Sequence, residues 1–313
     1  MKKILSLVAF ALTLMSTQVV AMSASPATGY TETKYPIVLV HGFLGFDSLL
    51  GVDYWYKVVE TLEKDGASVF VVTVPNASTP EIRGEVLIPQ IEDILAVTGA
   101  EKVNLIGHSH GGPTTRYVAS VRPDLVASVT SISGVNKGTP IADKLMELSD
   151  DSAAFDAVFG TLVNTAAQVL NVISGANYDG VNAMVAIESM TTANGDIFNA
   201  QHPGGIPATA CGEGAYQANG VHYYSWAGAD PTTNVLDPTD LITIAFGQFF
   251  PSGVAHDGFV GSCAAHLGMV IRDDFRMNHL DEVNQFLGLH DLTETDPLTV
   301  FRTHANRLKL TGL

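Results

Sequence analysis

The sequence has 313 residues, and 46% of them are hydrophobic, which is enough apolar material for one large core or two small ones. Its 32 acidic residues outnumber 16 basic ones, so the formal net charge is −16 at pH 7. Such a surface repels phosphate backbones and anionic lipid, and we therefore expect no nucleic-acid partner. An uncharged lipid surface and a divalent cation are both compatible with this charge.

The N-terminal residues have the pattern of a secretory signal peptide. Lys2 and Lys3 precede an apolar run at residues 4–15, and small residues follow at 21–24. The run is shorter than the about 20 residues that a membrane-spanning helix needs. We therefore expect cleavage near residues 21–24, with an uncleaved anchor as the alternative. Because no linker interrupts the rest, residues 25–313 are predicted to form a single domain.

After residue 36, short apolar runs alternate with helical stretches. The predicted strands are residues 37–40, 69–74, 103–106 and 129–132. The predicted helices are residues 53–64, 83–97 and 111–121, which end near glycine or proline. Continuous apolar strands separated by helices indicate a parallel sheet that is covered on both faces. The predicted fold class is therefore α/β.

Between a predicted strand and a predicted helix, residues 107–111 read GHSHG and match the G-x-S-x-G motif. A tight strand-to-helix turn strains the backbone of its serine, and glycines two residues away on each side avoid a clash. The turn lifts the hydroxyl above the sheet edge, in front of the N-terminus of the next helix. Ser109 is therefore the predicted nucleophile.

A serine nucleophile needs a base that takes its proton and donors that bind the oxyanion. The loop HGFLG follows the strand at residues 37–40, so we assign the oxyanion hole to the backbone N–H groups of Phe43 and His110. The acid and the base should follow the serine in that order. Spacing alone leaves several aspartates and four histidines as candidates: His256, His266, His279 and His304.

A long apolar segment follows the predicted sheet strands. Apolar residues recur at helical spacing from residue 153 to residue 173. We interpret residues 150–177 as a helical lid whose apolar face covers a site and meets lipid when it opens. An ordinary core helix is the alternative.

Beyond residue 195 the sequence is rich in loops, with one further strand predicted at residues 221–227. Cys211 and Cys263 are the only cysteines. In an exported protein the oxidising compartment favours a disulfide between them, and two buried free thiols are the alternative.

Four blocks in order carry a resemblance to a known family: KYPIVLVHGFLGFDSLLGVDYW, VNLIGHSHGGPTTRYVASVRPDL, ACGEGAY and RMNHLDEVNQ. Together they resemble the secreted bacterial true lipases of the Pseudomonas type, from about residue 34 to residue 308. The resemblance implies an α/β-hydrolase fold with a mostly parallel central sheet. It also implies hydrolysis of triacylglycerols at a lipid–water interface.

The same resemblance implies the remaining site residues. The triad acid falls on Asp257 in an A-x-D-G stretch, and the base falls on His279 in MNHLD. One structural Ca²⁺ is implied, with ligands from the carboxylates of Asp237 and Asp281. The backbone carbonyls of Gln285 and Leu289 complete the implied ligand set. The two cysteines match the single disulfide of the family.

The family also implies partners and a destination. Its members commonly need a dedicated membrane-anchored foldase, then pass through the periplasm and leave the cell by secretion machinery. A monomer is expected. Two other functions are kept open: a carboxylesterase for soluble short-chain esters, and a non-catalytic, calcium-dependent secreted binding protein.

Overall fold

The computed structural model describes residues 29–45, 48–49, 52–150 and 182–313. The predicted signal peptide and nearly all of the predicted lid lie outside these residues. The main sheet has seven strands. Six of them follow the order β4-β1-β5-β6-β8-β7, and the seventh, β9, also pairs with β8. Its strands are β1 (Ile37–Val40), β4 (Val69–Val72), β5 (Val103–His108), β6 (Val126–Ile132), β7 (Gln217–Ala218), β8 (Val221–Gly228) and β9 (Met269–Phe275).

All pairings in the large sheet are parallel except the β7–β8 hairpin. A separate antiparallel pair joins β2 (Ser48–Leu49) to β3 (Val52–Asp53). The described helices are α1 (Val58–Glu63), α2 (Pro80–Thr98), α3 (Gly111–Val121), α4 (Pro140–Asp150), α7 (Ala183–Ser189), α8 (Thr192–Gln201), α9 (Asp240–Gly247) and α10 (Pro297–Leu310). Two short 3-10 helices are η2 (Ser262–Ala265) and η3 (Asp281–Val283).

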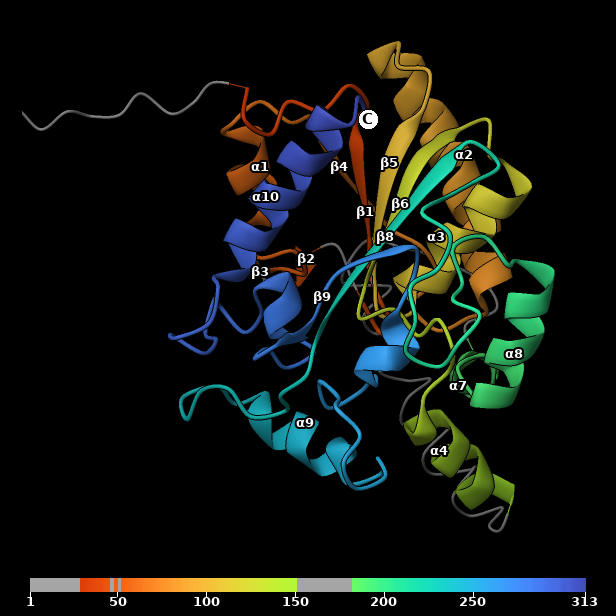
Figure 1. The fold of residues 1–313 in the computed structure, drawn as a ribbon, viewed down its shortest axis with the longest axis vertical. Helices are drawn as coiled ribbons and strands as arrows, with labels where there is room; N and C mark the ends of the chain where they lie inside the picture. Colours follow the sequence, from red (N-terminus) through yellow and green to blue (C-terminus); the bar gives the residue numbers. More distant parts are fainter. Residues whose placement is uncertain (1–28, 46–47, 50–51, 151–181) are drawn as a thin grey trace, which may run out of the picture.

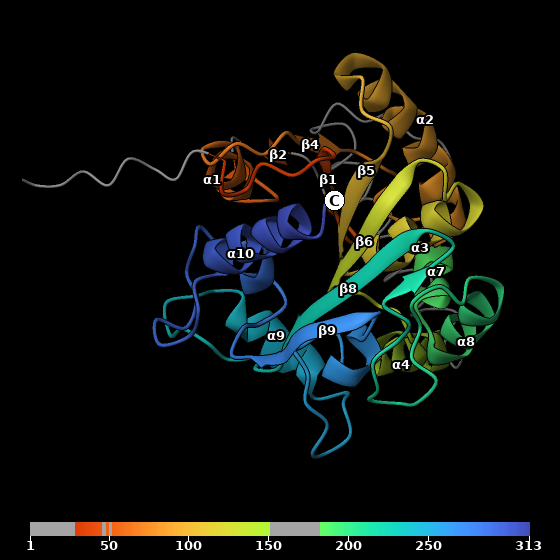
Figure 2. The ribbon, with the colours of Figure 1, turned by 45° about the horizontal axis from the view of Figure 1, so that its top comes forward.

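The alternation of side chains along β1 creates two apolar cores, one on each face of the sheet. Ile37 and Leu39 pack in one cluster with Phe301 of α10, whereas Val38 and Val40 pack in another with residues of α2 and α3. Figures 1 and 2 show α1 and α10 on one side of the sheet and α2 and α3 on the other. The expected α/β-hydrolase architecture, with helices on both faces, is confirmed.

Some element boundaries differ from the prediction. The helix expected at residues 53–64 begins only at Val58, because residue 53 belongs to β3 and a turn precedes the helix. The strand expected at 129–132 begins at Val126. Among the described helices none is both long and apolar enough to cross a membrane.

The disulfide links Cys211 to Cys263, 52 residues apart in sequence. Cys211 precedes β7, and Cys263 lies in η2. The Lys137 ammonium lies against this junction and donates to the carbonyls of Thr209, Ala210 and Cys263. The bridge therefore ties two long loops together beside the segment that carries Asp257.

Replacing both cysteines with serine should lower the free energy of unfolding by about 4 kcal/mol, because the open loop gains entropy in the unfolded chain. Chemical denaturation of the oxidised wild type and of the Cys211→Ser/Cys263→Ser variant measures this difference. Reductant serves as the control, since it should move only the wild-type midpoint. Equal midpoints for the two oxidised proteins would contradict the prediction.

Candidate active site

Ser109 lies in the turn between β5 and α3, and its φ of 57° is in the left-handed region that side chains with a Cβ disfavour. The Ser109 N–H donates to the Ile132 carbonyl over 2.9 Å. Its own carbonyl accepts from Gly112 N at 3.0 Å and from Val135 N at 3.2 Å. These three hydrogen bonds hold the strained turn against the end of β6.

Close backbone packing explains the two motif glycines. A Cβ on Gly107 would lie 2.2 Å from the Gly111 carbonyl oxygen, and a Cβ on Gly111 would lie 2.3 Å from the Val40 carbonyl oxygen. Neither position has room for a side chain, because each obstacle is a backbone atom. Glycine at both places therefore lets the turn pack against itself and against the end of β1.

The structure brings Asp257 and His279 together. The Nδ1 atom of His279 is 2.7 Å from Asp257 Oδ2, and the His279 N–H donates to the Asp257 carbonyl over 3.0 Å. The second carboxylate oxygen of Asp257 accepts from the N–H groups of Phe259 and Val260 at 2.8 and 2.7 Å. Both oxygens of this fully buried carboxylate are thus engaged.

The environment of Asp257 favours its charged form. Burial alone would raise the pKa of Asp257, but attraction to His279, the hydrogen bond to its ring and the two backbone donors outweigh it. The pKa of Asp257 is therefore lower than its ordinary value. An ionised Asp257 fixes the hydrogen of His279 on Nδ1, which leaves Nε2 as the ring nitrogen that can accept a proton.

His279 is held next to the serine turn by two neighbouring rings. Its ring centroid lies 4.5 Å from that of His108, the residue before Ser109, and 5.2 Å from that of Phe259. The other three candidate histidines have different partners. Within the described residues, His256 stacks on Phe250, His266 bonds to Asp273 and the Gly212 carbonyl, and His304 bonds to Thr130.

The loop after β1 lies directly against Ser109. A Cβ on Gly42 would come within 2.7 Å of the Ser109 Cβ. The loop is fixed by hydrogen bonds from Leu44 N to the Asn76 carbonyl and from Gly42 N to the Tyr54 hydroxyl. In the described part of the chain, no acceptor takes the N–H of Phe43 or of His110. The two expected oxyanion donors are therefore available.

The buried guanidinium of Arg83 holds the loop after β1 in place through hydrogen bonds. Arg83 donates through Nη2 to the His41 carbonyl, through Nη1 to the Pro75 carbonyl and through Nε to Thr114 of α3. Burial lowers the pKa of Arg83 to about 9. Burial, with Arg83 nearby, also lowers the pKa of His41 to about 3, so His41 is neutral. The Arg83 bonds join the loop after β1 to α3, the helix that follows Ser109.

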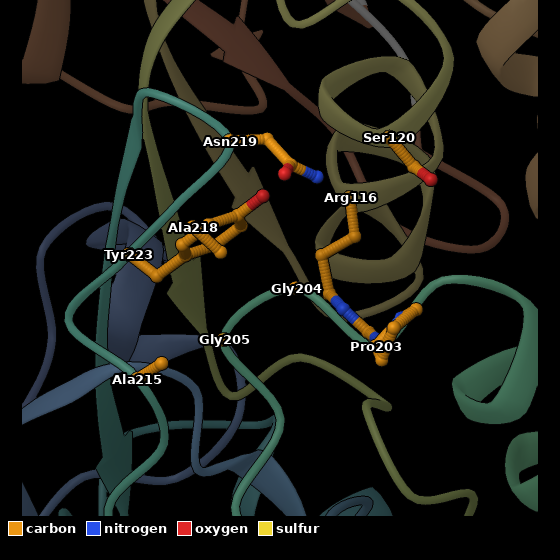
Figure 3. Close-up of a pocket in the computed structure, with 9 residues that line it drawn as sticks. All are labelled: Arg116, Ser120, Pro203, Gly204, Gly205, Ala215, Ala218, Asn219 and Tyr223. Atoms are coloured by element: carbon orange, nitrogen blue, oxygen red, sulfur yellow. The ribbon is translucent and has the colours of Figure 1, made fainter.

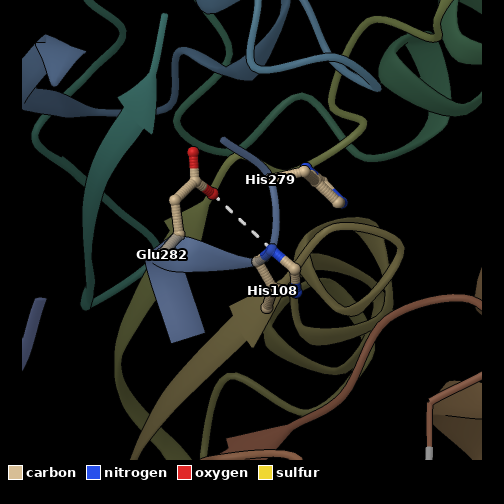
Figure 4. Close-up of side chains that lie close together, drawn as sticks. All are labelled: His108, His279 and Glu282. Atoms are coloured by element: carbon tan, nitrogen blue, oxygen red, sulfur yellow. Dashed lines mark ion pairs between the residues drawn. The ribbon is translucent and has the colours of Figure 1, made fainter. Parts of the chain in front are cut away.

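A second buried acid, Glu282, lies beside the histidines (Figure 4). Its Oε1 accepts from Ser133 Oγ at 2.6 Å and from Gly228 N at 2.5 Å, and its Oε2 is 3.5 Å from His108 Nε2. Burial raises the pKa of Glu282 well above its ordinary value, and the Asp257 charge raises it further. Burial and the charge of His279 lower the pKa of His108.

The two pKa shifts both disfavour the charged forms, so they weaken the ion pair that the 3.5 Å spacing of Glu282 and His108 would otherwise allow. The Nδ1 atom of His108 is also bonded to the Tyr54 hydroxyl at 2.6 Å. Ligand atoms of His108, His279 and Glu282 lie within 4.8 Å of one another, a spacing that a metal ion could bridge. We interpret the cluster instead as packing around His279, whose ring contacts that of His108.

Two further buried carboxylates lie beyond this cluster. Asp237 Oδ1 accepts from the N–H and hydroxyl of Thr239, and Asp281 Oδ2 accepts from Asn278 N. The other oxygen of each aspartate is buried, and no described donor meets hydrogen-bond geometry with it, although the Thr233 side chain lies close enough to Asp281 to lower its pKa. Burial raises the pKa of Asp281 to about 8, and the charges of Asp237 and Asp240 contribute.

Asp237 and Asp281 thus each offer a free carboxylate oxygen, and Asp240 adds a third carboxylate nearby. Such oxygen ligands suit a cation such as Ca²⁺. The predicted carbonyl ligands belong to the loop after η3, where the Gln285 side chain donates to the Asp53 and Tyr54 carbonyls. Leu289 follows in the same loop, with its N–H bonded to the Phe286 carbonyl.

Sequence reasoning did not single out Tyr54, Arg83 or Glu282. Glu282 lies in the same block as His279, but a glutamate beside an aspartate is more typical of an exposed helix start. Tyr54 lies in the first block of the resemblance, yet nothing in its neighbours indicates a contact with His108. Only the fold brings these side chains to the serine turn.

Comparison with known proteins places the chain in a family. The family described as alpha/beta hydrolase fold matches residues 35–283. A triacylglycerol lipase of Vibrio cholerae is 50% identical over 100% of both chains. A triacylglycerol lipase of Pseudomonas fragi is 39% identical, over 90% of this chain and 98% of its own.

A structural relative supports the fold alone. The mature lipase BlEst2 of Bacillus licheniformis superimposes with a TM-score of 0.58 at 17% identity. The match covers 91% of this chain and 94% of that chain.

Gly107→Ala should lower kcat for a soluble ester by about a hundredfold or more, because the new methyl group displaces the serine turn. The matched control is Gly261→Ala, whose Cβ would meet nothing closer than 3.6 Å and should leave kcat nearly unchanged. Circular dichroism checks that both variants fold. A folded Gly107→Ala protein with wild-type kcat would refute this account of the turn.

Proposed function

The chain belongs to the bacterial triacylglycerol lipases of the α/β-hydrolase family, and from this premise we propose that Ser109, His279 and Asp257 are its catalytic triad. Its reaction is the hydrolysis of triacylglycerol esters. The observation that carries the triad is the 2.7 Å bond between Asp257 and His279, beside the strained turn at Ser109.

In the proposed reaction, Ser109 Oγ attacks the ester carbonyl carbon while His279 Nε2 takes the hydroxyl proton. The carbon–oxygen bond to the alcohol then breaks, and His279 returns the proton to the leaving oxygen. Water attacks the acyl-serine, gives a proton to His279, and the fatty acid leaves as Ser109 recovers its hydrogen. Asp257 keeps the imidazole in the required tautomer and stabilises its charged form.

The N–H groups of Phe43 and His110 form the proposed oxyanion hole. Support comes from their lack of an acceptor among the described residues and from the contact of Gly42 with Ser109. Two backbone donors that are already in place stabilise the tetrahedral intermediate without reorganisation. Arg83 contributes indirectly, because it fixes the carbonyl of His41 at the start of the same loop.

Asp237 and Asp281, with the carbonyls of Gln285 and Leu289, are the proposed holders of one structural Ca²⁺. The support is the donor-free oxygen on each aspartate. A bound cation would supply positive charge between the two carboxylates. Because Asp281 is two residues from His279, the same residues would then also keep the base in position.

We further propose that residues 1–24 are a signal peptide and that residues 25–313 are one secreted domain. Residues 150–177 form the proposed lid over a site that meets the lipid–water interface. A foldase and the secretion machinery are the proposed partners on the route through the periplasm, and the mature protein is a proposed monomer. These proposals rest on the sequence pattern and on similarity to the triacylglycerol lipases of Vibrio cholerae and Pseudomonas fragi.

Ser109→Ala should lower the release of fatty acid from emulsified triolein by at least about a thousandfold, because removal of the nucleophile leaves only binding and the oxyanion donors. Hydrolysis of soluble p-nitrophenyl butyrate should fall equally. Titration of released acid, with Asp196→Asn as a surface control, measures both. Near wild-type turnover in Ser109→Ala would refute the triad. Wild-type activity on the soluble ester alone would indicate a carboxylesterase.

Addition of Ca²⁺ to about 1 mM should raise the Tm of the chelator-treated protein, because a ligand that binds only the folded state stabilises it. Asp281→Asn should lose most of this shift, since one of the two charged ligands is removed. The control Asp196→Asn, in α8, should keep it. Differential scanning calorimetry measures the midpoints. An unchanged shift in Asp281→Asn would place the cation elsewhere.

A further inference from the structure

Helix α9 presents its apolar side to solvent and its polar side to the protein. Its buried residues are Asp240, Thr243 and Gly247. Its exposed apolar residues include Leu241, Ile242 and Ile244, which are 74%, 48% and 39% exposed. A surface helix of a globular protein normally has the opposite orientation, with its apolar stripe toward the core. Apolar surface on α9 is therefore left open to solvent.

Hydrogen bonds on the inner side hold α9 in this orientation. Oδ2 of Asp240 accepts from the N–H groups of Thr233 and Asn234 at 3.0 and 2.9 Å. The Thr243 hydroxyl donates to the Pro231 carbonyl over 2.6 Å. A rotation that buried the apolar side of α9 would break these bonds. The outward apolar side is therefore fixed by the fold.

The segments that flank α9 add further exposed apolar side chains. Val235 and Leu236 precede the helix and Phe249 follows it, and all three are exposed. Single exposed apolar residues are normal on a protein, whereas a group of them marks a contact with another molecule or with lipid. We define the α9 patch as Leu241, Ile242, Ile244 and Phe249.

The charge of the chain narrows the choice of partner for the α9 patch. The sequence from residue 145 to residue 271 contains neither lysine nor arginine, and the whole chain has a formal net charge of −16. Anionic lipid surfaces attract proteins through lysine and arginine near the surface. Apolar side chains of a helix enter a lipid surface without needing such charges. The partner that fits is therefore a lipid surface without net charge.

A row of aromatic rings runs from the α9 patch to the proposed catalytic base. The ring centroid of Phe249 lies 6.2 Å from that of Phe246, which lies 5.1 Å from that of Phe259. Phe259 in turn lies 5.2 Å from the ring of His279. Figure 1 shows α9 at the lower margin of the molecule, away from α2 and α3. A surface that holds α9 would thus be close to the active site.

We propose that the α9 patch docks the protein on the uncharged surface of triacylglycerol, with its side chains among the acyl chains. This surface is distinct from the proposed lid, because α9 lies outside residues 150–177. The inference rests on the proposed function only in its choice of triacylglycerol as the lipid. Docking itself needs neither Ser109 nor turnover, so it can be measured without them.

Flotation of the full mature protein with triolein droplets coated with dioleoylphosphatidylcholine tests the proposal. The Ser109→Ala background is used, so that released fatty acid does not charge the droplets. Replacing Leu241, Ile242 and Ile244 together with serine should weaken droplet binding by at least about tenfold, because less apolar surface leaves water. The matched control is Val97→Ser/Leu310→Ser, two exposed apolar residues of α2 and α10, which should bind like the parent protein.

The single variant Leu241→Asp gives the answer if circular dichroism shows that the triple variant misfolds. Droplets coated with dioleoylphosphatidylglycerol should bind the parent protein at least about tenfold more weakly, because both surfaces are then negative. Unchanged droplet binding in Leu241→Asp, an equal loss in the control, or tighter binding to the anionic droplets would each overturn the proposal. A dimer that sediments in the parent and dissociates in Leu241→Asp would assign the α9 patch to a second copy instead. Loss of droplet binding with Ser109-dependent turnover intact would contradict docking alone, whereas turnover that survives Ser109→Ala would contradict only the triad.

Discussion

The geometry of the active site depends on backbone packing around one strained residue. Ser109 keeps a left-handed conformation because Gly107 and Gly111 let the turn approach itself and the end of β1 within distances that exclude a Cβ. The bonds of Ser109 to Ile132 and Val135 then attach the turn to the end of β6. Because parallel strands end at the same edge of a sheet, the loops after β1, β5 and β6 meet at this turn. Ser109, the proposed nucleophile, is thus positioned by backbone atoms.

Two carboxyl groups near His279 acquire opposite properties from their surroundings. Asp257 receives two backbone N–H bonds and the ring of His279, so its pKa is lowered in spite of burial. Burial raises the pKa of Glu282 and the charge of Asp257 raises it further, and its bonds to one hydroxyl and one backbone N–H do not offset them. Environments that separate the pKa values of neighbouring acids are typical of active sites. The Asp257 carboxylate therefore faces His279, the proposed base, while burial disfavours a second charge on Glu282 in the adjoining space.

The sequence predicted those parts of the fold in which burial leaves a local pattern. The buried strands β1 and β5 are short apolar runs, and the GHSHG motif fixed the position of the strained turn. Strand β9, MVIRDDF, was missed because it is mostly only partly buried and carries three charged residues. The contacts of Tyr54 with His108 and of Arg83 with His41 join residues that are far apart in the chain. Because such contacts form only when the chain folds, the sequence pattern did not predict them. The choice among the late histidines likewise needed the family resemblance.

The two buried arginines, Arg83 of α2 and Arg116 of α3, differ in how many of their nitrogens donate to described residues. Each nitrogen of Arg83 donates to a protein oxygen, from Thr114, Pro75 and His41, and the guanidinium joins three segments around the serine turn. Arg116 is buried to a similar degree and has a similarly lowered pKa, yet two of its three nitrogens lack acceptors in the described residues. Burial alone therefore does not explain the difference. Arg83 lies among protein oxygens that accept from each of its nitrogens, whereas Arg116, whose guanidinium runs toward Pro203 in Figure 3, has Nε and Nη1 buried where no described residue supplies an acceptor.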